Sequence, residues 1–379
     1  MDSQRQIAPL TGLRAVAALY VFFFHIQIRW PFVPTKFLAN LVEQGAVGMS
    51  IFFVLSGFIL THQYAGPRFD LRRYAINRFA RIYPVYALCA LLSIGWIGIP
   101  WGGWQNIARM VILVASNILL VQAWFPPFFG YWNDGGSWSI SVEAFLYFML
   151  PLMLPWLARQ SRKNLAIIVS VAYVASILPG MVFNLWQDTL FTVTYAMPIF
   201  RLPEFVIGVC ACLMLRGARP SSKVVIAATA LMLCAVSDLG IVGYKFSGYT
   251  IHNWIVDPAV VLVIISLTVR NIASRIMGSR PVVWLGEISY CIYSLQPFII
   301  RPLLHDHKKL VKHFPIFAHD SVLFVTALMI LVVSSGLCHH LVERPTRDFI
   351  RKRFSARHAT VTAGEGSVVE MPLITDFAT

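Results

Sequence analysis

Long apolar stretches separated by short polar segments recur along the whole chain. A helix needs about 20 mostly apolar residues to cross the hydrocarbon core of a bilayer. Ten stretches approach that length: 10–29, 45–64, 81–100, 138–158, 164–183, 197–215, 224–243, 256–270, 284–304 and 320–342. The alternation typical of a transmembrane β-barrel is absent from the sequence. The pattern therefore predicts an all-α, polytopic integral membrane protein with about ten transmembrane helices.

One further apolar stretch, 109–122, is short for a crossing. It fits a tilted span, a re-entrant helix or an interfacial helix, and the pattern leaves these three open. The spans assign residues 1–345 to one membrane-embedded domain. The remaining residues, 346–379, are expected to form a basic, disordered cytoplasmic tail, because no apolar periodicity continues into them.

Composition and charge point to the same class of protein. The hydrophobic fraction is 58% and the charged fraction 13%, against roughly 45–50% and about 25% in soluble domains. The net charge of +14 does not indicate a nucleic-acid partner, because most basic residues fall in alternate loops and the carboxy-terminal segment. Such a positive-inside bias predicts that both termini are cytoplasmic and that membrane lipids surround the chain. It also places the loop 66–80 in the cytoplasm.

The cysteines are expected to be small core residues, because all six lie within or at the ends of apolar stretches. Their positions show neither the spacing of a metal site nor a paired extracellular framework. No metal site is therefore expected.

The first span carries two ionisable residues, Arg14 and His25. Eleven residues on an ideal helix make three turns plus roughly 20°, with a rise of about 16 Å, so both side chains share one face. Ionisable groups inside a span are expensive and usually face the bundle interior. His25 is therefore a candidate general base or transient nucleophile. The alternative is a buried structural histidine, with Arg14 reaching the interface.

A cluster of arginines follows the second span, and its members are candidates for binding the phosphates of a nucleotide-containing donor. The alternative role is to set topology and contact anionic lipids. The cluster consists of Arg72, Arg73, Arg78 and Arg81.

Other polar residues inside or beside the spans are candidates for substrate binding or structural roles. Ser56 belongs to a small-residue set with Gly48 and Gly57 that would permit close helix packing. Ser137 or Ser139 could cap the fourth span, and Glu143 lies about one turn inside it, where it needs a basic or donor partner. The remaining candidates are Trp138, Tyr290 and the pair Arg201–Glu204, whose i,i+3 spacing permits mutual neutralisation.

In this order, the polar segments resemble the membrane-bound acyltransferase-3 family over residues 9–345. The resemblance implies a ten-helix core in the bacterial plasma (inner) membrane. It implies transfer of an acyl group, usually acetyl, from acyl-coenzyme A to a hydroxyl of a cell-envelope or exported glycan or a lipid-linked sugar. The matching segments are Leu13–Ala15 through His25, Phe52–Phe58, Arg72 through Pro84, Ser137–Ser139 with Glu143, and Ser289–Tyr293.

The resemblance also implies that Arg14 and His25 are essential, and Glu143 joins them as a candidate catalytic residue. Arg14 would stabilise the oxyanion or bind a donor oxygen. Many family members have a histidine at the position of Gln296, so no second catalytic histidine is assigned here. Acyl-coenzyme A is expected as a donor substrate, without a permanently bound cofactor. The alternative function is a proton-coupled transporter or flippase for a sugar-containing substrate, which would use the same intramembrane charges together with Glu204.

Overall fold

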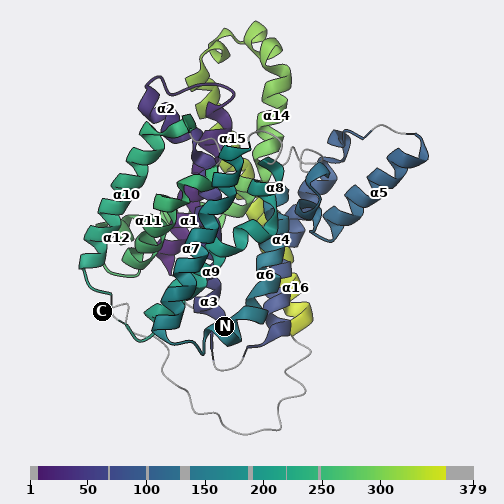
Figure 1. Cartoon of the computed structure of the whole chain (residues 1–379). Helices are drawn as coiled ribbons and strands as arrows, with labels where there is room; N and C mark the ends of the chain where they lie inside the picture. The colour runs from purple at the N-terminus through teal and green to yellow at the C-terminus, as the bar shows by residue number, and fades with distance from the viewer. Residues whose placement is uncertain are drawn as a thin grey trace.

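The computed structural model of the chain describes residues 7–66, 69–99, 102–128, 137–186, 191–218, 220–245 and 249–355. Helices are the only regular elements in these ranges, so the predicted all-α class is confirmed (Figure 1). The α-helices are α1 (Ala8–Gln27), α2 (Lys36–Glu43), α3 (Gly48–Tyr64), α4 (Leu71–Leu92), α5 (Trp104–Ile118), α6 (Trp138–Leu157), α7 (Arg162–Leu185), α8 (Phe191–Ala196), α9 (Pro198–Leu215), α10 (Lys223–Ile241), α11 (Asn253–Leu267), α12 (Ile272–Met277), α13 (Arg280–Glu287), α14 (Ser289–His313), α15 (Asp320–Cys338) and α16 (Arg344–Ser355).

Eight helical segments among the described residues are long and apolar enough to cross a membrane. They are Ala8–Gln27, Lys36–Tyr64, Trp138–Leu157, Arg162–Leu185, Val193–Leu215, Lys223–Ile241, Tyr249–Leu267 and Asp320–Phe354. The two other expected spans, 81–100 and 284–304, correspond to α4 and to α13–α14, where charged residues accompany the apolar ones. The chain is therefore a polytopic membrane protein.

α4 begins at Leu71, well before the expected start of its span at residue 81. Asp70 occupies the N-cap, and its carboxylate accepts a hydrogen bond from the backbone N–H of Arg73 at 2.9 Å. An anion at this position satisfies an unpaired donor and complements the positive end of the helix dipole. The expected loop over 66–80 is thus wrong for residues 71–80, which are helical.

α5 covers most of the stretch 109–122, whose role the sequence left open. A helix of 15 residues rises only about 22 Å, and Figure 1 shows α5 projecting sideways from the bundle. Trp104, Ile107 and Val111 on this helix have exposed fractions of 77%, 59% and 61%. The stretch is a lateral helix rather than one of the packed spans.

The helices differ in how deeply they are packed. In the segments that contain α1, α3, α9 and α11, 61%, 78%, 61% and 61% of the most apolar window is buried, against 28% for α7 and 22% for α10. The first four helices therefore form the centre, while α7 and α10 lie at the periphery. Apolar side chains such as Val171 and Ile226 are exposed there, as expected of groups that face lipid.

Small residues allow α3 and α9 to lie in close contact. A Cβ atom on Gly57 would come within 2.1 Å of the Phe205 carbonyl oxygen, and one on Gly208 within 1.9 Å of the Val54 carbonyl oxygen. Gly48 plays the same part between α3 and α1, where its Cβ would lie 3.0 Å from the Ala17 carbonyl oxygen. The predicted packing role of Gly48 and Gly57 is confirmed.

The amino-terminal start of α1 and helix α16 lie at the same end of the bundle, which we call the basic end (Figure 1). The expected boundary at residue 345 and the expected disordered tail 346–379 need revision, because residues 344–355 form α16. α16 is held by a buried ion pair described below. Residues 356–379 lie outside the described ranges.

The α3–α9 contact makes a testable prediction. Gly208→Ala should destabilise the protein by about 1–3 kcal/mol, because the added methyl group overpacks a backbone contact that cannot relax cheaply. Thermal unfolding of the purified protein in detergent measures this. Gly95→Ala is the control, since its Cβ would meet nothing within 4 Å. Equal unfolding temperatures for the two variants would contradict the close approach.

Candidate active site

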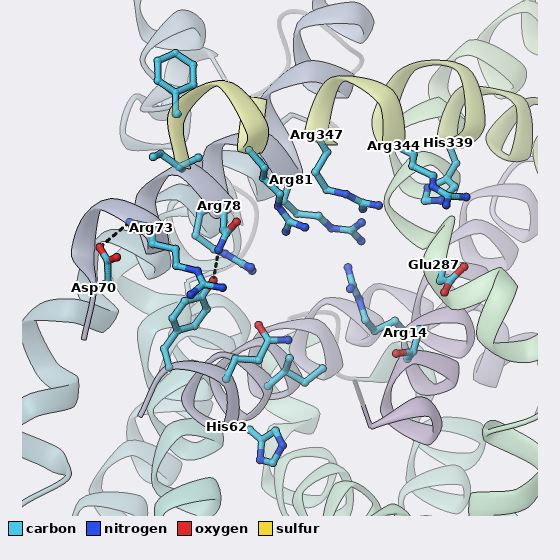
Figure 2. A pocket seen from close by; sticks show the side chains of 18 of the residues that line it. Arg14, His62, Asp70, Arg73, Arg78, Arg81, Glu287, His339, Arg344 and Arg347 are labelled. Carbon is cyan, nitrogen blue, oxygen red and sulfur yellow. Dashed lines mark hydrogen bonds between the residues drawn. The ribbon is translucent and has the colours of Figure 1, made fainter. Parts of the chain in front are cut away.

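A pocket of about 890 Å³ lies at the basic end, lined by residues of α1, α3, α4 and α16. Its volume is in the range of about 300–1,000 Å³ usual for small-molecule sites. Nine Arg or Lys residues line it, against two acidic residues, Asp70 and Glu287. Figure 2 shows Arg14, Arg81 and Arg347 pointing into the same space. This excess of positive charge favours a polyanionic ligand.

α4 supplies four of these cations, Arg72, Arg73, Arg78 and Arg81. The predicted cluster is therefore brought together in one pocket, although on a helix rather than in a loop. The guanidinium carbon of Arg78 lies 5.7 Å from the ring centre of Tyr64 and 5.6 Å from that of Tyr147. These cation–π contacts restrict the Arg78 side chain.

A π-helical turn, His339–Glu343, joins α15 to α16. It directs the fully buried carboxylate of Glu343 toward Arg81, with which it forms an ion pair. The same oxygen lies 3.4 Å from Arg347 Nη1, and the other oxygen lies 2.9 Å from His339 Nδ1. Turns of this kind are frequent at functional sites.

The contribution of α16 to the pocket was not predicted from the sequence. The cations after residue 343 were interpreted as determinants of topology, whereas four of them line the pocket: Arg344, Arg347, Arg351 and Lys352. The available signal was their spacing. Arg344, Arg347 and Arg351 recur at i, i+3 and i+7, which places them on one helix face.

Cys291, His339 and Glu343 form a buried cluster in which the potential ligand atoms lie within 4.8 Å of one another. Such a set could take a metal ion, and the sequence did not predict it because Cys291 is remote in the chain. Both carboxylate oxygens of Glu343, however, already accept from proton donors. Arg81 contacts one oxygen, and Cys291 Sγ lies 3.3 Å from the other. The Glu343 carboxylate therefore has the contacts of a hydrogen-bonded anion rather than those of a metal ligand.

Arg14 lines the large pocket and also a second cavity of about 20 Å³, which has room for about one water molecule. Glu143 and Tyr290 line that cavity as well. The Tyr147 hydroxyl donates to Glu143 Oε2 at 3.1 Å, and the Tyr290 hydroxyl donates to the Ile82 carbonyl oxygen at 2.6 Å. Glu143 therefore has the basic and donor partners that its position in a span requires.

His25 lies farther along α1, where its Nδ1 is 2.8 Å from the side-chain oxygen Oε1 of Gln296 on α14. Tyr290, Tyr293 and Gln296 lie at i, i+3 and i+6 on α14, so their side chains step around this helix by about 60° each, from the small cavity at Tyr290 and Tyr293 to the contact of Gln296 with His25. Gln296 is 1% exposed. Arg14 and His25 thus both face α14.

The serines at the start of α6 do not cap it. Ser137 occupies the N-cap but forms no side-chain cap hydrogen bond, and the Ser139 hydroxyl instead donates to the Tyr293 hydroxyl at 2.8 Å. The capping prediction is wrong because a cross-helix partner competes for Ser139. Trp138 packs 4.9 Å from the ring centre of Tyr195. Ser56 lines neither cavity.

Arg201 and Glu204 form a fully buried ion pair, with Nη1 and Oε1 3.0 Å apart. The predicted i,i+3 neutralisation is confirmed, and it is part of a larger network. Ser50 and Asn253 each donate to the same carboxylate oxygen at 2.7 Å. The Arg201 guanidinium carbon lies 4.9 Å from the ring centre of Tyr195. Neither ion lines the two cavities, which favours a structural role for the pair.

The fold and the pocket together define a polytopic membrane protein with a cationic ligand site at one end. A family model described as an acyltransferase domain matches residues 7–339. The chain belongs to this acyltransferase-3 family and is a membrane acyltransferase. The transporter alternative is therefore wrong. No solved structure matches the chain.

Individual relatives show different extents of similarity. The chain is 27% identical to acyltransferase MdmB of Streptomyces mycarofaciens, over 98% of each chain. It is 23% identical to peptidoglycan O-acetyltransferase OatA of Listeria monocytogenes, over 77% of this chain and 49% of that protein. Identity with O-acetyltransferase OatA of Staphylococcus aureus is 21%, over 94% and 59%. The chain thus spans about half the length of the two OatA proteins.

The Arg201–Glu204 network predicts a specific stability pattern. Arg201→Met should cost about 3–5 kcal/mol, because it leaves the Glu204 carboxylate charged and unpaired in the interior. The double variant Arg201→Met, Glu204→Leu should recover much of that loss, since apolar replacement of both partners of a buried pair is often tolerated. The unfolding temperatures of the single and double variants, measured in detergent, test this pattern. A stable Arg201→Met protein that has lost acyl transfer would instead indicate a substrate-binding role.

Proposed function

We propose that this acyltransferase moves an acyl group, in the simplest case acetyl, from acyl-coenzyme A to a hydroxyl of a glycan or lipid-linked sugar. One observation carries the proposal: Arg14 lines both the basic pocket and the small cavity beside Tyr290. From Tyr290, α14 continues by less than two turns to Gln296, which contacts His25. A cationic site for nucleotide phosphates is thereby joined to a candidate base.

Acyl-coenzyme A matches the charge of the pocket. Its phosphates are anions with several acceptor oxygens, and arginine binds such groups through charge-assisted, often bidentate hydrogen bonds. The four α4 arginines, Arg72, Arg73, Arg78 and Arg81, are proposed to hold this end of the donor. The thioester at the other end would then extend past Arg14 toward His25.

Distance favours one of the two roles considered for Arg14. Arg14 and His25 are eleven residues apart on one continuous helix, a rise of about 16 Å. Side chains on a helix lean toward its amino terminus, so the Arg14 guanidinium does not approach a carbonyl group held at His25. Arg14 is therefore proposed to bind donor oxygens remote from the reacting carbon. Glu143, which shares a cavity with Arg14, is proposed to hold that guanidinium in place.

His25 is proposed to act through Nε2. An amide oxygen can only accept, so the contact with Gln296 Oε1 assigns a proton to Nδ1, and in the neutral imidazole Nε2 is then the basic nitrogen. As a base, Nε2 takes the acceptor hydroxyl proton while the oxygen attacks the thioester carbon. The C–S bond breaks, and the coenzyme A thiolate leaves and recovers the proton. The acyl-imidazole route would use the same nitrogen.

The orientation follows from the donor. Acyl-coenzyme A is a cytoplasmic metabolite, so the basic end is proposed to face the cytoplasm, with both termini on that side, in agreement with the positive-inside bias. The acceptor would approach His25 from the opposite end. A relative whose name specifies peptidoglycan O-acetylation supports a glycan acceptor. Residence in a bacterial inner membrane is part of the same proposal.

The proposed function predicts that His25→Gln is folded but inactive. Glutamine can replace a structural hydrogen bond, yet it cannot take up a proton near neutral pH or carry an acyl group. Loss of a general base typically costs about 10²–10⁴-fold in rate. Consumption of acetyl-coenzyme A by purified protein, with an acceptor sugar present, measures the effect.

The matched control is His313→Gln, because His313 is an exposed histidine whose Nδ1 contacts the Lys309 carbonyl oxygen at the end of α14. It should keep full activity. Substantial acyl transfer by His25→Gln with normal unfolding temperature would contradict the assignment of His25. Failure of the wild-type protein to consume any acyl-coenzyme A would contradict the donor.

Gln296 makes a separate prediction as a positioning residue. Gln296→Leu keeps the side-chain volume but removes the acceptor for His25 Nδ1–H, so kcat should fall about tenfold to a hundredfold, while KM for the donor stays unchanged. Gln296→Glu retains an acceptor oxygen and should recover part of the loss. In a His25→Ala background, Gln296→Leu should have no further effect. Additive losses in that double variant would show that Gln296 acts independently of His25.

A further inference from the structure

α16 lies beyond residues 7–339, which match the family model, yet it lines the basic pocket. Arg351 and Lys352 are two turns from the Glu343 carboxylate that neutralises Arg81. In the described part of the chain, neither Arg351 nor Lys352 forms an ion pair. Asp348 on the same helix attracts Arg351, but within the described ranges it forms no ion pair with it, so the far end of α16 adds net positive charge to the pocket.

This concentration of charge is unfavourable without a ligand. Arg351 is repelled by both Arg347 and Arg78, which come from two different helices. The Nε–H groups of these three arginines are buried and, among the described residues, have no hydrogen-bond partner. Buried donors without partners and like charges in proximity both cost free energy. A bound anion would remove both penalties.

The place of Arg351 in the pocket indicates which anion. Arg14 lies near Arg81 and Glu343, next to the start of α16, whereas Arg351 lies near Arg78. Arg351 is seven residues beyond Arg344, the first residue of α16, a rise of about 10 Å. The acyl end of the donor points toward Arg14 in the proposed function. The end of the donor that is farthest from the acyl group therefore lies near Arg351 and Lys352.

We infer that α16 binds the terminal phosphate monoester of the donor, the 3′-phosphate of coenzyme A, through Arg351 and Lys352. The inference rests on the proposed function. A phosphate monoester carries about −1.5 to −2 charges near pH 7 and three acceptor oxygens, more than either phosphate of the neighbouring diphosphate link. α16 thereby distinguishes coenzyme A from nucleotides that lack this group.

The experiment compares binding of acetyl-coenzyme A and acetyl-3′-dephospho-coenzyme A to the purified full chain in neutral detergent, by calorimetry. The wild-type protein should prefer the phosphorylated donor by at least about tenfold, the effect expected from one or two charge-assisted hydrogen bonds. In Arg351→Ala, Lys352→Ala, the two Kd values should converge. The affinity for the dephosphorylated donor should stay unchanged, and higher salt should weaken the wild-type preference.

Arg353→Ala is the matched control, since Arg353 is an exposed cation on the same helix that does not line the pocket. It should keep the wild-type preference. Equal binding of the two donors by the wild-type protein, or a preference that survives in the double variant, would overturn the role of α16 and leave the donor assignment intact. Absence of binding of either donor would overturn the proposed donor and this inference together.

An anionic lipid headgroup has the same phosphate chemistry and is the competing source. If α16 binds lipid instead of the donor, the double variant should keep the wild-type preference for acetyl-coenzyme A over its dephosphorylated form. It would then lose any extra thermal stabilisation by dioctanoyl-phosphatidylglycerol over dioctanoyl-phosphatidylcholine. That combination of results would also overturn the inference.

Discussion

The ion pair between Arg81 and Glu343 is the interaction on which the basic end depends. The Glu343 side chain is completely buried and that of Arg81 is 13% exposed, so neither charge could be maintained there alone. The pair joins α4 to the π-helical turn that begins α16. It therefore brings the two helices that carry most of the pocket's cations to the same place. Without this anion, Arg81 and Arg347 would repel each other across the junction.

The same constraint explains the rest of the polar interior. In lipid, a charge inside a helix bundle is tolerated only where other groups of the protein hold it. Arg201 is held by Glu204 and aromatic rings, and Glu143 by Tyr147 and the nearby Arg14. His25, by contrast, is held by a neutral amide oxygen. That contact suits the general-base role proposed for His25.

The sequence predicted the fold class and most spans because apolar length is a one-dimensional signal. It also predicted that Arg14 and His25 share one face of α1, because an ideal helix places residues eleven apart on one face. It failed where partners are distant in the chain. Nothing near Arg81 indicates Glu343, 262 residues away, and nothing near His25 indicates Gln296, 271 residues away.

The remaining wrong predictions concern helix ends, where local hydrogen bonds and buried charges decide the structure. Serine is a residue type that often caps helices, but the Ser139 hydroxyl donates its hydrogen bond to Tyr293 on another helix. Arg72 and Arg73 lie between two expected spans and resemble loop residues, yet the Asp70 cap starts a helix before them. α16 was expected to be disordered because it lacks an apolar stripe. Its structure depends on burial of Glu343 just before its first residue, and the charge pattern of α16 itself does not encode that burial.

The proposed route places the donor phosphates and the reacting carbon at opposite ends of a narrow passage through the bundle. The cavity between them is about 20 Å³, too small for the arm that links the thioester to the nucleotide. Donor loading on the proposed route therefore requires side chains around Arg14 to move, and Met49, which lines this cavity, has the flexible side chain suited to that. A passage that stayed open would admit water to the thioester and ions across the membrane. Binding energy from the phosphates at the basic end can open this passage only when a donor is present, so that remote contacts support the chemical step.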